Sequence, residues 1–197
     1  MENKLRIIKI LDENRKGKHI RELSRLIGTG LPNVKRYLDI LEKEKIVKRE
    51  KIGNIINSSL LYNNLLVPYL KQINTYKFIE LPKNVQLAIQ DFLDSLEQKP
   101  LISLIFGSYA KGSYTKNSDL DIFLVFQNVN NEKNIEETTK RISMRSNINI
   151  NPIYIEYLTF KSNFMDKNHS FSNEIRNNVI IINGVEYYYE LIREFIK

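Results

Sequence analysis

The sequence predicts an α+β protein in two parts: a small helical part that ends in a hairpin, and a larger part with a small mixed sheet flanked by helices. In residues 1–45, apolar residues recur at the spacing of helices, and glycines interrupt the pattern. Two short runs of branched and aromatic residues, 101–106 and 120–126, flank a polar loop, as paired strands do. Helical periodicity returns on both sides of these runs, so strands and helices share the second part.

Composition limits the classes of function. The chain has 197 residues, of which 42% are apolar and 27% charged, enough for one ordinary domain and a smaller one. No apolar run reaches the length that spans a bilayer, and the charged N-terminus lacks a signal-peptide core, so we expect a cytoplasmic protein without a membrane partner. Cysteine is absent, which excludes disulfides, thiolate zinc sites and thiol nucleophiles. Metal binding must therefore use carboxylates.

The positive charge is concentrated at the start of the chain. Residues 1–53 contain 15 Lys and Arg against 8 Asp and Glu, a net charge of +7, whereas the remainder is balanced at 15 against 15. Such an asymmetry is typical of a module that faces nucleic acid, attached to a neutral body.

The elements of this first part follow one another closely. A helix stops at Gly17, a second covers residues 20–27 and ends at a glycine-bearing turn, and Pro32 opens a third that runs to about Lys45. Residues 46–51 and 55–61 read as two strands joined by a turn. A short helix, a turn, a longer helix and a hairpin form the pattern of a winged helix-turn-helix over residues 1–62.

The segment 19–50 resembles winged helix-turn-helix DNA-binding domains, and the resemblance implies duplex DNA as a partner. The residues expected to contact DNA lie at the start of the third helix and on the wing: Asn33, Lys35, Arg36, Lys48, Arg49 and Lys51. The alternative at this point is a three-helix bundle whose lysines are only solvated.

A linker helix is expected within residues 63–82, and residues 83–197 form the second domain. Its expected elements are a helix at 84–98, strands at 101–106 and 120–126, a helix at 132–145, a strand at 149–157, helices at 158–165 and 171–177, an apolar stretch at 179–182 and a helix at 186–196.

The loop between the first two strands carries the chemistry. It reads GSYAKG, then five residues, then SDLD, and the glycine lets the backbone approach a phosphate closely while Ser108 adds a hydroxyl donor. Side chains alternate along a strand, so Asp119 and Asp121 point the same way while Leu120 and Ile122 face the other side. Two carboxylates on one face suit Mg²⁺.

These residues resemble the signature of the DNA polymerase β-like nucleotidyltransferases, and the small stand-alone branch called minimal nucleotidyltransferases matches best. The resemblance implies that Mg²⁺ and ATP, or another nucleoside triphosphate, bind here and that an acceptor hydroxyl is activated. It places the metal on Asp119 and Asp121, which are also the catalytic pair. The nucleotide-binding residues would be Gly107, Ser108, Lys111, Gly112 and Ser118.

This chain departs from the family pattern at a third acid, which relatives carry on a later strand. The position that aligns there holds Asn151 or Ile153, and Glu156 is the only acid in that strand. Glu156 is therefore included as a weak catalytic candidate. An asparagine is a poor base and adds no charge. Lys111 stands where relatives often have arginine, which loses bidentate phosphate geometry.

Two functions remain open from the sequence. The first is a transferase that moves a nucleotidyl group, AMP from Mg-ATP, to a hydroxyl acceptor and is coupled to DNA binding. Some minimal nucleotidyltransferases are antitoxins that adenylylate a partner toxin, and the resemblance allows a toxin-like protein acceptor. The second is a DNA-binding transcriptional regulator whose transferase fold is a nucleotide sensor or a dimerisation body without catalysis, with a homodimer as the assembly.

Overall fold

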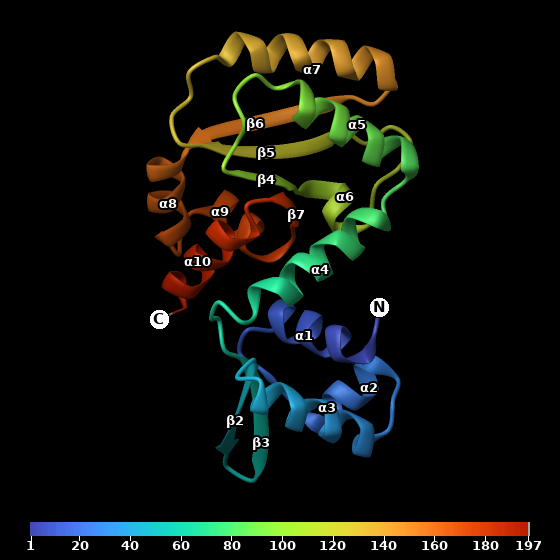
Figure 1. Cartoon of the computed structure of the whole chain (residues 1–197), viewed down its shortest axis with the longest axis vertical. Helices are drawn as coiled ribbons and strands as arrows, with labels where there is room; N and C mark the ends of the chain where they lie inside the picture. The colour runs from blue at the N-terminus through green and yellow to red at the C-terminus, as the bar shows by residue number, and fades with distance from the viewer. Residues whose placement is uncertain (197) are drawn as a thin grey trace. The chain divides into compact units, whose positions relative to one another are not determined.

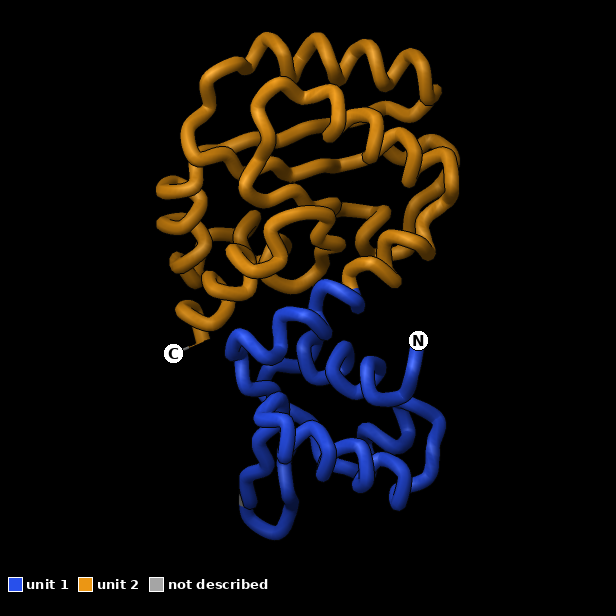
Figure 2. Tube along the Cα trace, viewed as in Figure 1, with its two compact units in different colours: residues 1–73 blue, residues 74–197 orange. Residues whose placement is uncertain are grey.

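The computed structural model describes residues 1–196, so residue 197, the last of the expected second domain, lies outside the described residues. The chain divides into two compact units, Met1–Ile73 and Asn74–Lys197, which Figure 2 shows in blue and orange. The division falls inside one helix, α4 (Val67–Ile79), which lies within the segment expected to be the linker.

The first unit contains three helices and a three-stranded sheet. Its elements are α1 (Asn3–Glu13), β1 (Lys18–His19), α2 (Ile20–Ile27), α3 (Leu31–Lys43), β2 (Val47–Ile52) and β3 (Ile55–Leu60). Strands β2 and β3 form an antiparallel hairpin, and β1 pairs with the outer edge of β3, giving the order β1-β3-β2. The hairpin matches the two predicted strands, whereas β1 was not predicted, because a run of two residues has no periodicity to detect.

The helices of the first unit form where capping residues and apolar spacing agree. The imidazole of His19 accepts from the Glu22 N–H at the start of α2, which ends at Gly28 in the left-handed conformation. Pro32 stands in the first turn of α3, where its missing N–H costs nothing. The predicted inner face of α3 is buried: Val34, Leu38 and Leu41 are at most 1% exposed.

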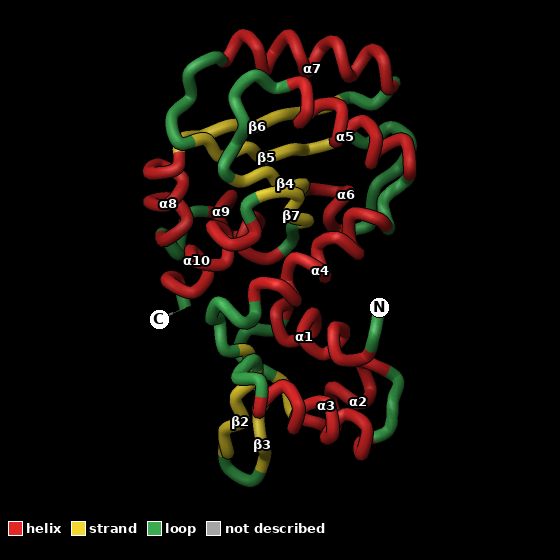
Figure 3. Tube along the Cα trace, in the orientation of Figure 1, coloured by secondary structure: helices red, strands yellow, loops and turns green. Residues whose placement is uncertain are grey.

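The second unit places one sheet between two groups of helices (Figures 1 and 3). Its elements are α5 (Lys83–Ser95), β4 (Ile102–Ile105), α6 (Gly107–Lys111), β5 (Leu120–Phe126), α7 (Glu132–Ser146), β6 (Ile150–Glu156), α8 (Tyr157–Met165), α9 (Ser170–Asn177), β7 (Ile180–Asn183) and α10 (Val185–Phe195).

The sheet of this unit is mixed, with the strand order β6-β5-β4-β7. Strands β4 and β5 are antiparallel, as a hairpin requires, and β6 runs parallel to β5 after the crossover through α7. Strand β7 pairs antiparallel with β4 and completes the sheet on the far side. The mixed α+β character that the sequence predicts is therefore confirmed.

Two hydrophobic layers enclose the sheet. Leu120, Ile122 and Leu124 of β5 pack with residues of α5 and α7 in one buried cluster. On the opposite face, Phe123 contacts the rings of Phe160 in α8 and Phe171 in α9, with centroid separations of 5.3 and 5.2 Å. Figure 1 shows α8, α9 and α10 gathered together, away from α7. The alternation along β5 thus decides which layer each side chain enters.

Within residues 1–196, no helix combines the length and the apolar character needed to cross a bilayer.

Candidate active site

Two carboxylates at the start of β5 form the centre of the site. Asp119 is exposed and Asp121 is partly exposed, whereas Leu120 between them is fully buried on the α5 and α7 side. Asp121 belongs to the same side of the sheet as Phe123, and Asp119 precedes it by the two residues that return a strand to the same face. The structure therefore brings both aspartates to one edge of the face that α8 and α9 cover farther along.

Each aspartate is hydrogen-bonded to an asparagine of the neighbouring strand segment. The Asn149 Nδ2 amide donates to Asp119 Oδ1 at 2.8 Å, and the Asn151 Nδ2 amide donates to Asp121 Oδ1 at 2.9 Å. The parallel register pairs Asp121 directly with Asn151. Asn151 therefore occupies the place across from the D-x-D pair, and Ile153, the other candidate for that position, pairs with Phe123.

A glycine turn closes against Asp121. Gly107 has φ +66°, a conformation that L side chains rarely adopt, and a Cβ built on it would lie 2.3 Å from Asp121 Oδ2. Only a residue without a side chain fits between the end of β4 and this carboxylate. Position 107 therefore requires glycine for two reasons. Its φ angle is positive, and the Asp121 carboxylate occupies the space that a side chain would need.

The other nucleotide-binding candidates follow Gly107 in the sequence, in α6 and in the loop that leads to β5. Ser108 is partly exposed in the first turn of α6, and Gly112 ends that helix with φ +71°. The Ser118 hydroxyl accepts from the Thr115 N–H at 2.8 Å, which holds the loop before β5. The Lys111 Nζ atom lies 2.5 Å from Glu174 Oε1 of α9, so an ion pair holds this lysine in the structure.

Glu156 does not join the two aspartates. It is the last residue of β6 and pairs with Phe126, five positions along the strand from the pair Asp121 and Asn151. Its Oε1 atom instead accepts from the Val129 N–H at 3.3 Å. Among residues 1–196, no three acidic or histidine side chains gather into a metal-binding group. The parallel register thus separates the weak third candidate from the catalytic pair.

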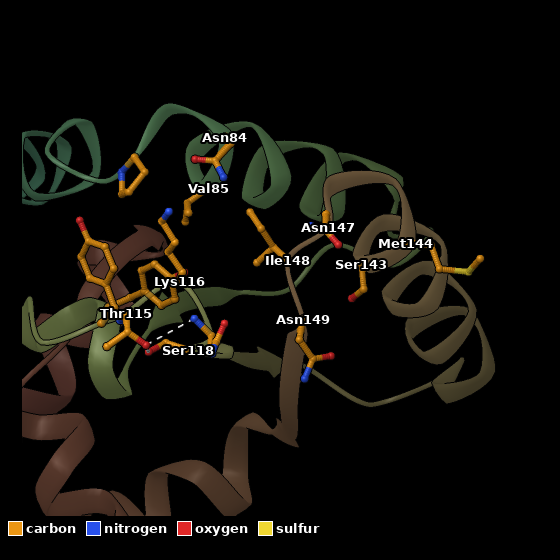
Figure 4. Close-up of a pocket in the computed structure, with 14 residues that line it drawn as sticks. Asn84, Val85, Thr115, Lys116, Ser118, Ser143, Met144, Asn147, Ile148 and Asn149 are labelled. Atoms are coloured by element: carbon orange, nitrogen blue, oxygen red, sulfur yellow. Dashed lines mark hydrogen bonds between the residues drawn. The ribbon is translucent and has the colours of Figure 1, made fainter.

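An open cleft of ≈ 1020 Å³ begins beside the carboxylates. Its lining is mostly uncharged and polar, with Pro82, Asn84, Val85, Tyr109, Tyr114, Thr115, Lys116, Asn117, Ser118, Ser143, Met144, Asn147, Ile148 and Asn149. Figure 4 shows Ser118 and Asn149 along one side, opposite Asn84 and Val85 of α5. Asn149 therefore belongs both to the cleft and, through its hydrogen bond, to the carboxylate pair.

Two tyrosines form an aromatic part of this cleft. The rings of Tyr109 and Tyr114 stack with centroids 4.5 Å apart and an interplanar angle of 8°. Burial raises the pKa of the Tyr109 phenol above its ordinary value, and the neighbouring Tyr114 and Asp119 add to the shift. The phenol is therefore protonated at neutral pH and has an O–H group that can donate a hydrogen bond.

The pair fits one divalent cation. Mg²⁺ in proteins commonly takes one or two carboxylates and completes its shell with water and substrate phosphates. Asp119 and Asp121 could supply two such ligands, since neither carboxylate side chain is buried, and the Gly107 turn brings the backbone against Asp121.

The first unit presents a separate candidate surface. Asn33, Lys35 and Arg36 are exposed on the N-terminal half of α3, and Lys48 and Lys51 are exposed on the hairpin. Lys48 is paired with Glu50 at 2.8 Å, so one of these two exposed wing lysines already has an acidic partner. Of the exposed cations expected to contact DNA, Lys35 and Arg36 on α3 therefore offer more positive charge to a phosphate backbone than the two lysines of the wing.

Arg49 differs from the other predicted DNA contacts. Its guanidinium lies 2.7 Å from Asp39 Oδ1 and also forms an ion pair with Glu42, both on α3. The hydrogen bond from Arg49 lowers the pKa of Glu42, and the same bond raises the pKa of Arg49. In the structure Arg49 joins the hairpin to α3, which sequence reasoning did not anticipate.

Comparison with known proteins agrees with the geometry of the second unit. Residues 88–181 match the family model described as Polymerase beta, Nucleotidyltransferase. This segment runs from α5 through the Gly107 turn, the D-x-D pair and β6 to β7. The family matched is the one that the sequence motif predicts, and the match includes both aspartates and the Gly107 turn. The winged helix-turn-helix interpretation of the first unit lies outside this match and stays a prediction.

A curated protein of Methanocaldococcus jannaschii named "Putative protein adenylyltransferase" is 29% identical over 99 residues, which is 49% of this chain and 92% of that protein. No solved structure matches the chain. The similarity therefore covers about half of this chain and nearly all of that relative.

Sequence reasoning missed two features of the site. Asn149 was not singled out as a site residue. The signal that could have identified it is its spacing from Asn151, which repeats the two-residue spacing of Asp119 and Asp121 on the neighbouring strand. Glu174 carried no signal at all, because its contact with Lys111 spans 63 residues of sequence.

Proposed function

We propose that the second unit transfers a nucleotidyl group, AMP from Mg-ATP, to a hydroxyl of a protein acceptor. The acceptor oxygen forms a bond to the α-phosphorus, the bond from the α-phosphorus to the oxygen of the β-phosphate breaks, pyrophosphate leaves, and the hydroxyl proton passes to solvent. The observation that carries the proposal is the placement of Asp119 and Asp121 on one side of the sheet, with Asp121 against the Gly107 turn, within a segment that matches the nucleotidyltransferase family. A phosphate-binding turn beside two carboxylates is the arrangement that nucleoside triphosphates with Mg²⁺ require.

Each residue of the site has a defined task in this proposal. Asp119 and Asp121 hold Mg²⁺, which when bound neutralises the phosphate charge and orients the triphosphate. The backbone at Gly107 approaches the phosphates, and the Ser108 hydroxyl and the Gly112 and Ser118 turns shape their loop. Lys111 supplies a positive charge once a phosphate replaces Glu174 as its partner. Asn149 and Asn151 fix the orientation of the carboxylates.

The proposed acceptor is a protein, by analogy with the name of the Methanocaldococcus jannaschii relative. A toxin-like partner that is inactivated by adenylylation fits such an activity, with this chain as the antitoxin. The open cleft beside Asp119 leaves room for a polypeptide segment to approach the site.

A second proposed activity belongs to the first unit, which binds duplex DNA as a winged helix-turn-helix. Support comes from the +7 net charge of residues 1–53 and the exposed Asn33, Lys35 and Arg36 at the start of α3. Positive side chains of this kind contact phosphates, and the first turns of such a helix reach base edges. A homodimer would present two copies to DNA.

The alternative is a DNA-binding regulator whose second unit binds a nucleotide, or serves for dimerisation, without transferring it. Among residues 1–196, no third carboxylate joins Asp119 and Asp121, and Asn151 faces Asp121 instead. This favours the alternative, because an amide cannot take the proton of an acceptor hydroxyl.

A labelling experiment for nucleotidyl transfer distinguishes the proposed transferase from a regulator that does not transfer the nucleotide. The protein is incubated with Mg²⁺, a cell lysate and ATP labelled on either the α- or the γ-phosphate. Nucleotidyl transfer predicts macromolecular label from α-labelled ATP only, and its loss in the Asp119→Asn, Asp121→Asn double variant but not in Asp94→Asn, an exposed aspartate of α5. Macromolecular label that persists in the double variant would contradict transfer by this site. The absence of any label when the folded wild-type protein is incubated with lysates of the source cell would also contradict it.

A further inference from the structure

The two aspartates and two asparagines form two neighbouring rungs across β5 and β6. The amide-to-carboxylate distances are 2.8 Å for Asn149 and Asp119 and 2.9 Å for Asn151 and Asp121. An ionised carboxylate only accepts hydrogen bonds, so each asparagine must turn its NH₂ group toward the acid. One oxygen of each carboxylate is therefore occupied by an N–H donor.

This arrangement limits how many cations the site holds. Two divalent cations in one phosphoryl-transfer site lie about 3.5–4 Å apart. A single Mg²⁺ already takes one or two carboxylates, so a second cation calls for further anionic ligands. Here the Oδ1 atoms of Asp119 and Asp121 each already accept one amide hydrogen bond, which uses one of the lone pairs that each carboxylate could offer to a cation. A turned amide would offer a neutral oxygen without charge. Within the described part of the chain, no third acid or histidine joins the pair.

We propose that Asn151 fixes the capacity of this site at one divalent cation per bound nucleotide, and that Asn151→Asp raises it to two. The inference rests on the proposed function, because it concerns the cation that accompanies the nucleotide. Asn151 is chosen over Asn149 because it is in register with Asp121, the aspartate that lies against the Gly107 turn. Asn149 precedes β6 and also lines the cleft.

The variant has a second expected property. Asn151→Asp places two carboxylates across a contact that measures 2.9 Å in the wild type. Like charges at that distance repel each other and destabilise the cation-free fold. We expect the cation-free variant to melt at a lower temperature than the wild type and to recover more on addition of Mn²⁺.

The test counts cations directly and needs no turnover. The full-length protein is dialysed against Mn²⁺ and an ATP analogue with a methylene group between the α- and β-phosphorus atoms. Bound Mn²⁺ is measured by electron paramagnetic resonance and bound nucleotide by absorbance. We expect one Mn²⁺ per nucleotide in the wild type and two in Asn151→Asp. The control is Asn130→Asp, the same change at an exposed position beyond the other end of β5, and its ratio should remain one.

The outcomes separate the two proposals. Two Mn²⁺ per nucleotide in the wild type, or one in a folded Asn151→Asp variant, overturns the role of Asn151 and leaves nucleotide binding intact. No retained nucleotide in the wild type overturns the proposed function, and the inference about Asn151 falls with it. If Asn151→Asp does not fold, the wild-type ratio alone decides, since a value of two contradicts the inference.

Discussion

Gly107 and Asp121 are in such close contact that no side chain fits between them: a Cβ on Gly107 would lie 2.3 Å from the Asp121 Oδ2 atom. Gly107 also has φ +66°, so both the backbone and the carboxylate require glycine. The turn after β4 and the metal-binding candidate of β5 are thereby fixed against one another.

Gly107→Ala should displace the Asp121 carboxylate and weaken Mg²⁺-dependent ATP binding by about tenfold or more. Gly28→Ala is the matched control, because Gly28 of the first unit has φ +72° and open space around its Cβ position, and it lies outside the candidate site. Both variants carry a similar backbone strain of about 1 kcal/mol. Titration calorimetry that finds equal ATP affinities in the two variants would refute the importance of this contact.

If Lys111 binds phosphate as proposed, Glu174 should compete with the nucleotide for it. The two side chains lie 2.5 Å apart and are partly exposed, so the pair is worth only about 0.4–1 kcal/mol. Glu174→Gln should therefore raise ATP affinity about two- to fivefold at low salt, with a smaller gain at high salt. Glu190→Gln, which breaks an exposed pair with Arg193, is the control. Unchanged or weaker binding in Glu174→Gln would show that Lys111 does not contact phosphate.

DNA binding by the first unit should depend on the cations of α3. Each lost phosphate contact reduces the slope of log affinity against log salt by about one, so Lys35→Ala with Arg36→Ala should lower it by about two. Lys133→Ala, an exposed lysine of α7, should leave the slope unchanged. Fluorescence anisotropy of the full chain on mixed duplexes across a salt series gives these slopes. Equal slopes in all three proteins would contradict an α3 interface.

Acid should weaken one ion-pair network of the first unit. The hydrogen bond from Lys4 lowers the pKa of Glu44, which also accepts from the Tyr69 hydroxyl at 2.9 Å. Because the folded pKa is below the unfolded one, the contribution is present at neutral pH and is lost as pH falls below about 4.3 and through the folded value. Glu44→Gln should thus lower the melting temperature at pH 7 but hardly at pH 3. Glu80→Gln is the control, and an equal deficit for Glu44→Gln at both pH values would contradict the linkage.

The sequence predicted those elements whose signal is local. The apolar runs of β4 and β5, the capping glycines and the inner faces of α3 and α5 all depend on residues close together along the chain. The alternation at Asp119 and Asp121 also follows from strand geometry alone. These features place the candidate site on the correct strands.

Features that depend on pairing between distant segments were not predictable in the same way. The register of β6 on β5 decides that Asn151 faces Asp121 and that Glu156 does not, and nothing in the β6 sequence alone fixes it. The ion pairs of Lys111 with Glu174 and of Arg49 with Asp39 join elements that only the fold brings together. A charged residue that a motif assigns to ligand binding can therefore already form an ion pair within the fold, and the motif alone does not reveal it.

The central claim is that Asp119 and Asp121 form the Mg²⁺-nucleotide site of this protein. Titration calorimetry of ATP into the full chain, with Mg²⁺ and with EDTA, tests it most directly. We expect Mg²⁺-dependent binding in the wild type and in Asp94→Asn, and none in the Asp119→Asn, Asp121→Asn double variant, whose circular dichroism should be unchanged because both side chains reach solvent. ATP affinity that is the same in the double variant as in the wild type would contradict the claim.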